Sequence, residues 1–228
     1  SLEDKLTALA AAQDIAALER ECVAADSALA AATVKLSARR AAAATKLAAA
    51  ATRELPDLAL PNAAFSIMLA PHAKVESTGA ESVEFTFRSH ASLPFAALAK
   101  VASGGELARL SLAILVVCGD AAAVPTLVFD EVDVGVGGRV AAQVGRKLQT
   151  LATRRQVLCV THMPQVAAHA DHHFTVSRDN TQSPTTHVDA LSKKERHAEI
   201  ARMLSGHEVG AATSSLAKAL LETSRRAL

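Results

Sequence analysis

Apolar residues recur at alternating three- and four-residue intervals through the first quarter of the chain. Residues 2–54 contain no glycine or proline, and the repeat runs for three heptads through Ile15, Leu18, Cys22, Ala25, Leu29, Ala32 and Leu36. This spacing is typical of one strand of a coiled coil, and Pro56 and Pro61 then end the helix. We therefore expect residues 1–55 to form a coiled-coil arm. A helix packed inside a globular bundle is the alternative.

Beyond these prolines the apolar pattern changes to short runs. Residues 63–70 and 82–88 alternate in polarity, which predicts two antiparallel strands joined around Thr78 and Gly79. Continuous apolar runs at 126–130 and 156–160 predict strands buried on both faces of a parallel sheet. Strands that alternate with helices favour an α/β fold, with a mainly parallel sheet, flanking helices and a small antiparallel part. The other expected elements are helices at 138–152, 164–169, 193–204 and 211–226, and strands at 172–178 and 185–191.

Two adjacent carboxylates, Asp130 and Glu131, stand at the end of the strand predicted at 126–130. Open α/β sheets bind ligands outside the carboxyl ends of their strands, and neighbouring carboxylates at such a place need a cation. Magnesium on a nucleoside triphosphate meets that need, with Asp130 in the metal shell and Glu131 at the attacking water. A pair of helix-capping acids is the alternative.

Two further segments suit phosphate binding. Ser103 is a good helix N-cap, and Glu106 follows three residues later, as in a capping box. Gly104 and Gly105 let the backbone approach a ligand, and the N-terminus of the helix that follows attracts anions. His162, after the strand predicted at 156–160, can donate to a terminal phosphate. An ordinary capped helix and a structural histidine are the alternatives.

In their order along the chain, Ser103 to Glu106, then Asp130 and Glu131, then His162, the three segments resemble the second half of an ABC-type ATPase head. The Asp-Glu-Val-Asp form of the acidic strand end indicates the SMC-like branch of that family, and within it the bacterial members that repair DNA double-strand breaks. The resemblance covers roughly residues 56–225. It is carried by KVASGGELAR (100–109), FDEVDVGVGGR (129–139), QVLCVTHMPQVAA (156–168) and ERHAEIARMLSG (195–206).

The resemblance implies a role for each motif. Asp130 would hold Mg²⁺ in a Walker B motif, Glu131 would act on the attacking water, and His162 would contact the γ-phosphate of ATP. The signature motif Ser103, Gly104, Gly105 and Glu106 would bind ATP held by a second copy, because such heads dimerise around two nucleotides. Asp133, Gly135 and Gly137 would form the D-loop at that interface, although Gly137 stands where many ABC proteins carry an aspartate.

A Walker A motif, Gly-x-x-x-x-Gly-Lys-Ser/Thr, is missing from the chain. In SMC-like proteins it lies near the N-terminus, beyond a long coiled coil. We therefore expect residues 1–55 to be the returning arm and residues 56–228 the C-terminal lobe of a head. The N-terminal half would be the partner that completes a Mg²⁺-dependent ATPase, and this piece alone would be inactive.

The amino-acid composition narrows the possible functions only slightly. The net charge is +1 and the chain has no Trp or Tyr, so neither charge nor base stacking indicates nucleic-acid binding. Cys22, Cys118 and Cys159 are widely spaced, which suggests buried thiols of a reducing compartment. The group His169, Asp171, His172 and His173 lacks clear metal-ligand spacing, and we expect surface residues there.

The resemblance also sets the expected biology. ATP would close two heads into a dimer, hydrolysis would open them, and the arms would act on DNA double-strand ends. We expect a bacterial, cytoplasmic, nucleoid-associated protein without a membrane segment. Two alternatives stay open at this point: another SMC-type chromosome ATPase, or a structural coiled-coil module whose head has lost catalysis.

Overall fold

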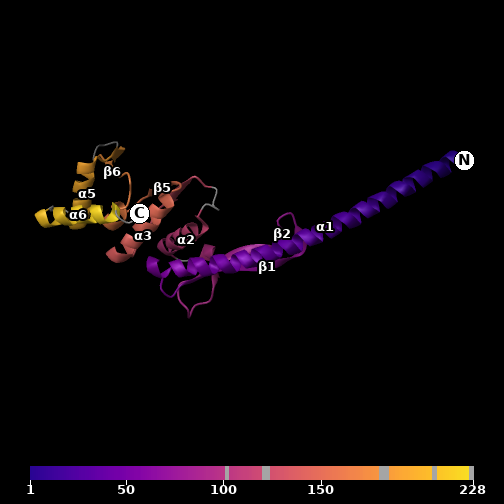
Figure 1. The fold of residues 1–228 in the computed structure, drawn as a ribbon, viewed down its shortest axis with the longest axis horizontal. Helices are drawn as coiled ribbons and strands as arrows, with labels where there is room; N and C mark the ends of the chain where they lie inside the picture. The colour runs from indigo at the N-terminus through magenta and orange to yellow at the C-terminus, as the bar shows by residue number, and fades with distance from the viewer. Residues whose placement is uncertain (101–102, 120–123, 180–184, 207–209, 226–228) are drawn as a thin grey trace. The chain divides into compact units, whose positions relative to one another are not determined.

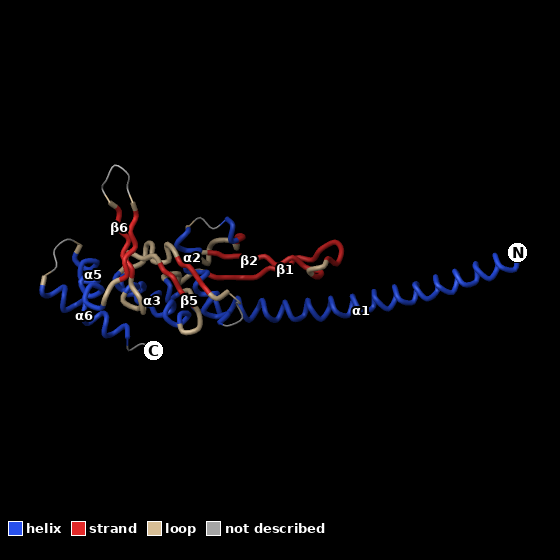
Figure 2. Tube along the Cα trace, turned by 90° about the horizontal axis from the view of Figure 1, so that it is seen from above, coloured by secondary structure: helices blue, strands red, loops and turns tan. Residues whose placement is uncertain are grey.

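The computed structural model describes residues 1–100, 103–119, 124–179, 185–206 and 210–225, with only the helical backbone at 11–14 and at 225. The chain divides into two compact units. The first consists of Ser1–Lys46 with Ile67–Phe85, and the second of Leu47–Ser66 with Thr86–Leu228. Figures 1 and 2 follow the elements along the chain. Within the described ranges, no helix is both long and apolar enough to cross a membrane.

Helix α1, Leu2–Glu54, has the length that its sequence predicts. In the first unit its apolar side chains are exposed, including Leu2 at 82% and Leu18 at 59%. Burying such side chains is the main source of helix stability in water. The exposed apolar side chains therefore favour the coiled-coil arm over a helix packed inside a globule, and the coiled-coil partner stays a prediction.

A hairpin accompanies α1 in the first unit. Strands β1, Ala64–Glu76, and β2, Gly79–Arg88, are longer than predicted and turn at residues 77–78. Arg40 of α1 donates through Nη2 to the carbonyl of Thr78 at 2.7 Å. Gly79 has φ +118°, and an added Cβ would lie 2.6 Å from Nη1 of Arg40. The turn therefore requires glycine at 79 for its backbone conformation, and a larger residue there would also require the Arg40 side chain to shift.

The second unit begins where α1 ends. Leu55 and Leu58 are fully buried, the latter in the short 3₁₀ helix η1, Pro56–Leu58. Lys147 forms ion pairs with Glu54 and with Asp57, the second at 3.4 Å. The proline that ends the helix and the buried leucines around it thus fix the end of α1 against α3, Gly138–Ala152.

The parallel part of the fold is a pair of short strands, β4, Thr126–Phe129, and β5, Gln156–Cys159. Their register runs from Thr126 opposite Gln156 to Phe129 opposite Cys159. Helices α2, Gly104–Cys118, and α3 pack against each other, and α3 also contacts β5. The predicted α/β class is confirmed. In the described residues, however, parallel pairing is confined to these two strands.

Antiparallel pairing accounts for the other strands. The short strand β3, Ala96–Ala97, joins the edge of β2 and leads into the 3₁₀ helix η2, Leu98–Lys100. Strands β6, Phe174–Arg178, and β7, Thr186–Ala190, form a separate hairpin. Local hairpins need only the turn between their own strands, whereas a parallel sheet grows by strands from distant segments. Among the described strands, antiparallel pairing is accordingly more common than the predicted mainly parallel sheet implied.

The expectation that β4 and β5 are buried on both faces is wrong for this chain. Val128 is 69% exposed, Leu158 is 47% exposed and Val160, just after β5, is 64% exposed. Phe129 on the opposite face is buried at 5%. One face of the pair is covered by this chain, and the other presents apolar side chains to solvent.

The C-terminal helices form their own small core. Helices α5, Lys193–Ser205, and α6, Ala211–Arg225, pack on the short helix α4, Pro164–Ala167, around Ile200 and Ala217. Ser192 and Glu195 form a complete capping box at the start of α5. Cys22 is exposed, contrary to expectation, because α1 has no covering layer there, whereas Cys118 and Cys159 are half-buried.

Candidate functional site

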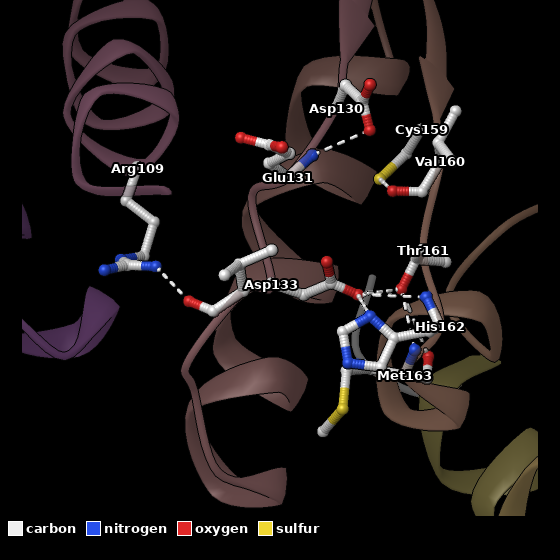
Figure 3. A network of polar contacts seen from close by, with 10 residues as sticks. Arg109, Asp130, Glu131, Asp133, Cys159, Val160, Thr161, His162 and Met163 are labelled. Carbon is white, nitrogen blue, oxygen red and sulfur yellow. Dashed lines mark hydrogen bonds and ion pairs between the residues drawn. The ribbon is translucent and has the colours of Figure 1, made fainter. Parts of the chain in front are cut away.

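The ends of β4 and β5 lie side by side and place the candidate residues at one edge of the sheet. The Val160 amide donates to the Phe129 carbonyl at 2.9 Å, which extends the parallel pairing beyond Cys159. Asp130 and Glu131 follow at once and are exposed (Figure 3). Both acids thus stand at the carboxyl end of a strand, open to a ligand.

The backbone turns sharply between the two acids. The Glu131 amide donates to Oδ1 of Asp130 at 2.9 Å. Glu131 itself has φ +57°, in the left-handed region, where a residue with a Cβ costs roughly 1–2 kcal/mol. Strain of this kind is concentrated at functional sites. The arrangement leaves one Asp130 oxygen directed away from the turn and keeps both carboxylates at the surface.

The N-terminus of α2 lies beside Glu131. Ser103 caps this helix by accepting from the Glu106 amide at 3.3 Å, which is one of the two bonds of the predicted capping box. A Cβ added to Gly104 would lie 2.5 Å from Oε2 of Glu131, so a larger residue there would require the Glu131 side chain to shift. The structure therefore brings Gly104, the first residue of α2, close to Glu131 of the same chain.

His162 lies at the same edge, in a turn fixed by Asp133. Oδ2 of Asp133 accepts from the Thr161 hydroxyl and, at 3.2 Å, from the His162 amide. Nδ1 of His162 is 3.6 Å from the same oxygen, while the histidine side chain is 70% exposed. The Met163 amide donates to Thr161 Oγ1 at 3.0 Å and closes the turn. Asp133 thus orients the imidazole on one side, and the exposed side of the ring is accessible to a ligand.

Asp133 of the predicted D-loop is buried. It is only 2% exposed, and its carboxylate accepts hydrogen bonds from the Thr161–His162 turn. Gly135, with φ +73°, and Gly137, the N-cap of α3, do lie in an exposed loop. Both glycines are therefore exposed, and their contact with another chain stays a prediction.

Arg109 was not predicted to have a role. It lies on the buried face of α2 with Gly105 and Ala113, is 6% exposed, and donates through Nη1 to the Val134 carbonyl at 2.8 Å. Burial lowers its pKa from the usual range, partly offset by Glu106. An arginine on the apolar stripe of an amphipathic helix is the sequence signal that identifies such a residue.

The electrostatics of the site also affect the cysteine at the end of β5. Burial, together with the nearby Asp133 and Asp130 carboxylates, raises the pKa of the Cys159 thiol to about 12. Cys159 is therefore a neutral packing residue beside the acids. Within the described ranges, no three potential metal ligands among His, Cys, Asp and Glu gather at one place.

The histidine group after α4 is less exposed than expected. His169 is buried at 7% and its Nδ1 lies 3.2 Å from Oε1 of Gln149, while His173 is half-buried. Burial lowers the pKa of both rings, and Arg146 and Arg196 lower it further at His169 and His173 respectively. Only His172 of the three is a surface residue.

An acid pair after a parallel strand, a glycine-rich capped helix and an oriented histidine, together with a long helical arm, define an ABC-type head lobe of the SMC-like class. Sequence relatives then give the particular family. The chain is 48% identical over 160 residues to the DNA repair protein RecN of Haemophilus influenzae, covering 69% of this chain and 29% of that protein. It is 40% identical over 233 residues to RecN of Mycobacterium tuberculosis, covering 93% and 40%.

The chain belongs to the RecN family. It spans less than half the length of the relatives given above. No protein-family model matches it. Among solved structures, the Smc head of Pyrococcus furiosus with its extended coiled coil aligns with a TM-score of 0.48 at 19% identity, covering 69% of this chain and 37% of that one. The Smc head of Pyrococcus yayanosii aligns with a TM-score of 0.47 at 20% identity, covering 68% and 28%.

Proposed function

We propose that this chain is the C-terminal lobe and returning arm of an ATP-driven head that acts in DNA double-strand-break repair. The observation that carries the proposal is the common edge at which Asp130, Glu131 and His162 stand exposed. The relatives named DNA repair protein RecN support the biological role. They also favour it over another SMC-type chromosome ATPase.

The acid pair suits a magnesium–triphosphate complex. Mg²⁺ is bound in proteins through one or two carboxylates together with substrate phosphates and water, and Asp130 offers one exposed carboxylate. When bound, the metal would neutralise charge on the phosphates. Glu131, one residue further along, would orient and polarise the attacking water, and His162 would donate to the γ-phosphate. Phosphoryl transfer needs little beyond this positioning and charge stabilisation.

The remaining motif residues would act in a dimer. Ser103, Gly104, Gly105 and Glu106 would bind ATP held by a second copy, with the N-terminus of α2 facing the γ-phosphate. Gly135 and Gly137 would lie at the same interface. A symmetric dimer uses each patch twice, so one interface would enclose two nucleotides.

The exposed face of β4 and β5 supports a missing partner. Parallel sheets are normally covered on both faces, yet Val128, Leu158 and Val160 are exposed here. The N-terminal half that carries the Walker A lysine would cover this face and complete the ATPase. The lobe by itself would then lack the phosphate cradle and would not turn over ATP.

The test is to combine this chain with the Walker A-bearing half and to compare the wild type with Glu131→Gln. We expect Mg²⁺-dependent turnover from the pair, a loss of roughly 10²-fold or more in Glu131→Gln, and an ATP-trapped dimer of that variant by light scattering. Glu222→Gln, an exposed position on α6, is the control. A Glu131→Gln variant that hydrolyses ATP at the wild-type rate, or stays monomeric with ATP, would contradict the proposal.

A further inference from the structure

A four-residue segment, Glu131 to Val134, is held from two sides. It carries one of the exposed acids and leads from β4 toward α3. Figure 3 shows Arg109 of α2 reaching toward it on one side and Asp133 pointing to Thr161 and His162 on the other. The two attachments involve different elements and different atoms of the same short segment.

The attachment to the histidine turn depends on the buried Asp133 carboxylate. Its Oδ2 receives the Thr161 hydroxyl and the His162 amide, and Nδ1 of His162 is within 3.6 Å. A carboxylate that is 2% exposed is stable only where donors surround it. The position of Asp133 therefore fixes the position of the Thr161–His162 turn, and the reverse is also true.

The attachment to α2 depends on Arg109 and Gly105. Nη1 of Arg109 donates to the Val134 carbonyl at 2.8 Å. A Cβ added to Gly105 would lie 3.4 Å from the Glu131 carbonyl oxygen and 3.4 Å from that of Val134. The first turn of α2 thus lies close to the backbone of the segment, and the buried guanidinium holds the far end of the segment to the same helix.

We propose that Asp133 and Arg109 are positioning residues. They would fix the N-terminus of α2, Glu131 and His162 relative to one another, so that the three move together. This inference rests on the proposed function and extends it. The α2 terminus would face the nucleotide held by a second copy, whereas Glu131 and His162 would face the nucleotide bound with their own lobe. The segment would therefore link the two nucleotide sites of a dimer inside each chain.

The first test needs no nucleotide. Hydrogen exchange of individual amides, followed by NMR in this chain, reports whether Asp133 holds the turn. We expect Asp133→Ala to speed exchange of the His162 and Met163 amides by roughly tenfold or more. Asp133→Asn should restore most of the protection, because its amide oxygen still accepts a hydrogen bond. Asp189→Ala, at an exposed position on β7, is the control. A folded Asp133→Ala protein with unchanged protection at His162 would overturn the inference.

The second test uses the chain combined with the Walker A-bearing half. We expect Asp133→Ala and Arg109→Met each to lower kcat by on the order of tenfold while KM for ATP changes by less than about twofold. The double variant should lose little beyond the worse single variant, because both act through one segment. Fully additive losses, or losses confined to KM, would overturn the inference.

The two proposals fail in different ways. A wild-type complex that does not turn over ATP would contradict the proposed function, whereas the exchange experiment would still report whether Asp133 holds the turn. A wild-type complex that is active, with Asp133→Ala equally active, would overturn the coupling and leave the ATPase assignment standing.

Discussion

Gly145 of α3 lies in direct contact with the imidazole of His169: a Cβ added to Gly145 would come within 2.4 Å of His169 Cδ2 and within 3.2 Å of the Gln165 carbonyl oxygen. The contact joins α3 to the turn after α4, close to the Thr161–His162 turn in sequence. It explains a glycine in the middle of a helix, where glycine normally reduces stability.

We expect Gly145→Ala to destabilise the chain by about 1–3 kcal/mol, because the added methyl overpacks a site already in contact. Helix propensity alone predicts the opposite sign, a gain of roughly 0.5–1 kcal/mol. Chemical denaturation of the two proteins measures the difference. The double variant Gly145→Ala/His169→Ala should lose less than the sum of its single variants, since the ring that meets the methyl is removed. A Gly145→Ala variant more stable than the wild type would disprove the tight contact.

The buried histidines predict how stability depends on pH. Burial lowers the pKa of His169 and His173 in the folded chain. The unfolded chain therefore takes up protons at a higher pH than the folded one. The stability that depends on neutral His169 and His173 should be complete above about pH 6.5. Below that pH the free energy of unfolding should fall, by up to about 1.4 kcal/mol per pH unit for each histidine, until the folded chain also takes up the protons.

Denaturation midpoints between pH 7.5 and pH 5 measure this slope. His169→Gln should flatten it, because one of the two titrating rings is gone. His172→Gln, at the neighbouring exposed ring, serves as the matched control and should keep the wild-type slope. Equal slopes for His169→Gln and the wild type would rule out the buried ring as a cause.

Cys22 and Cys159 should differ in their rates of alkylation. Cys22 is exposed on α1, whereas the pKa of Cys159 is raised to about 12. Because the thiolate is the reactive form, alkylation of Cys159 at pH 8 should be slower than that of Cys22 by roughly 10³-fold. Iodoacetamide labelling followed by peptide mass spectrometry measures both rates in one sample. Labelling of Cys159 at the rate of Cys22 in the folded chain would contradict the protected environment.

Local patterns predicted the elements well where the signal is itself local. Helix α3 was expected at 138–152 and occupies Gly138–Ala152, and α5 ends within one residue of expectation. Helix α6 begins at Ala211 as expected, and its expected end at 226 lies outside the described residues. Capping residues, apolar periodicity and prolines act within a few residues of each other, so the sequence carries them directly. The turn of the first hairpin lies at residues 77–78, one residue before the expected position. The approach of Arg40 to Gly79 joins segments far apart in the sequence, and local patterns do not predict it.

Sequence alone therefore determined which segments become helices and strands, and which motifs follow the two parallel strands. Tertiary structure decided the direction in which each side chain faces: Asp133 turns inward to Thr161, Glu131 lies against Gly104, and Val128 stays exposed. The physical reason is that periodicity follows from backbone geometry within one element, whereas burial depends on which other segment covers a given face.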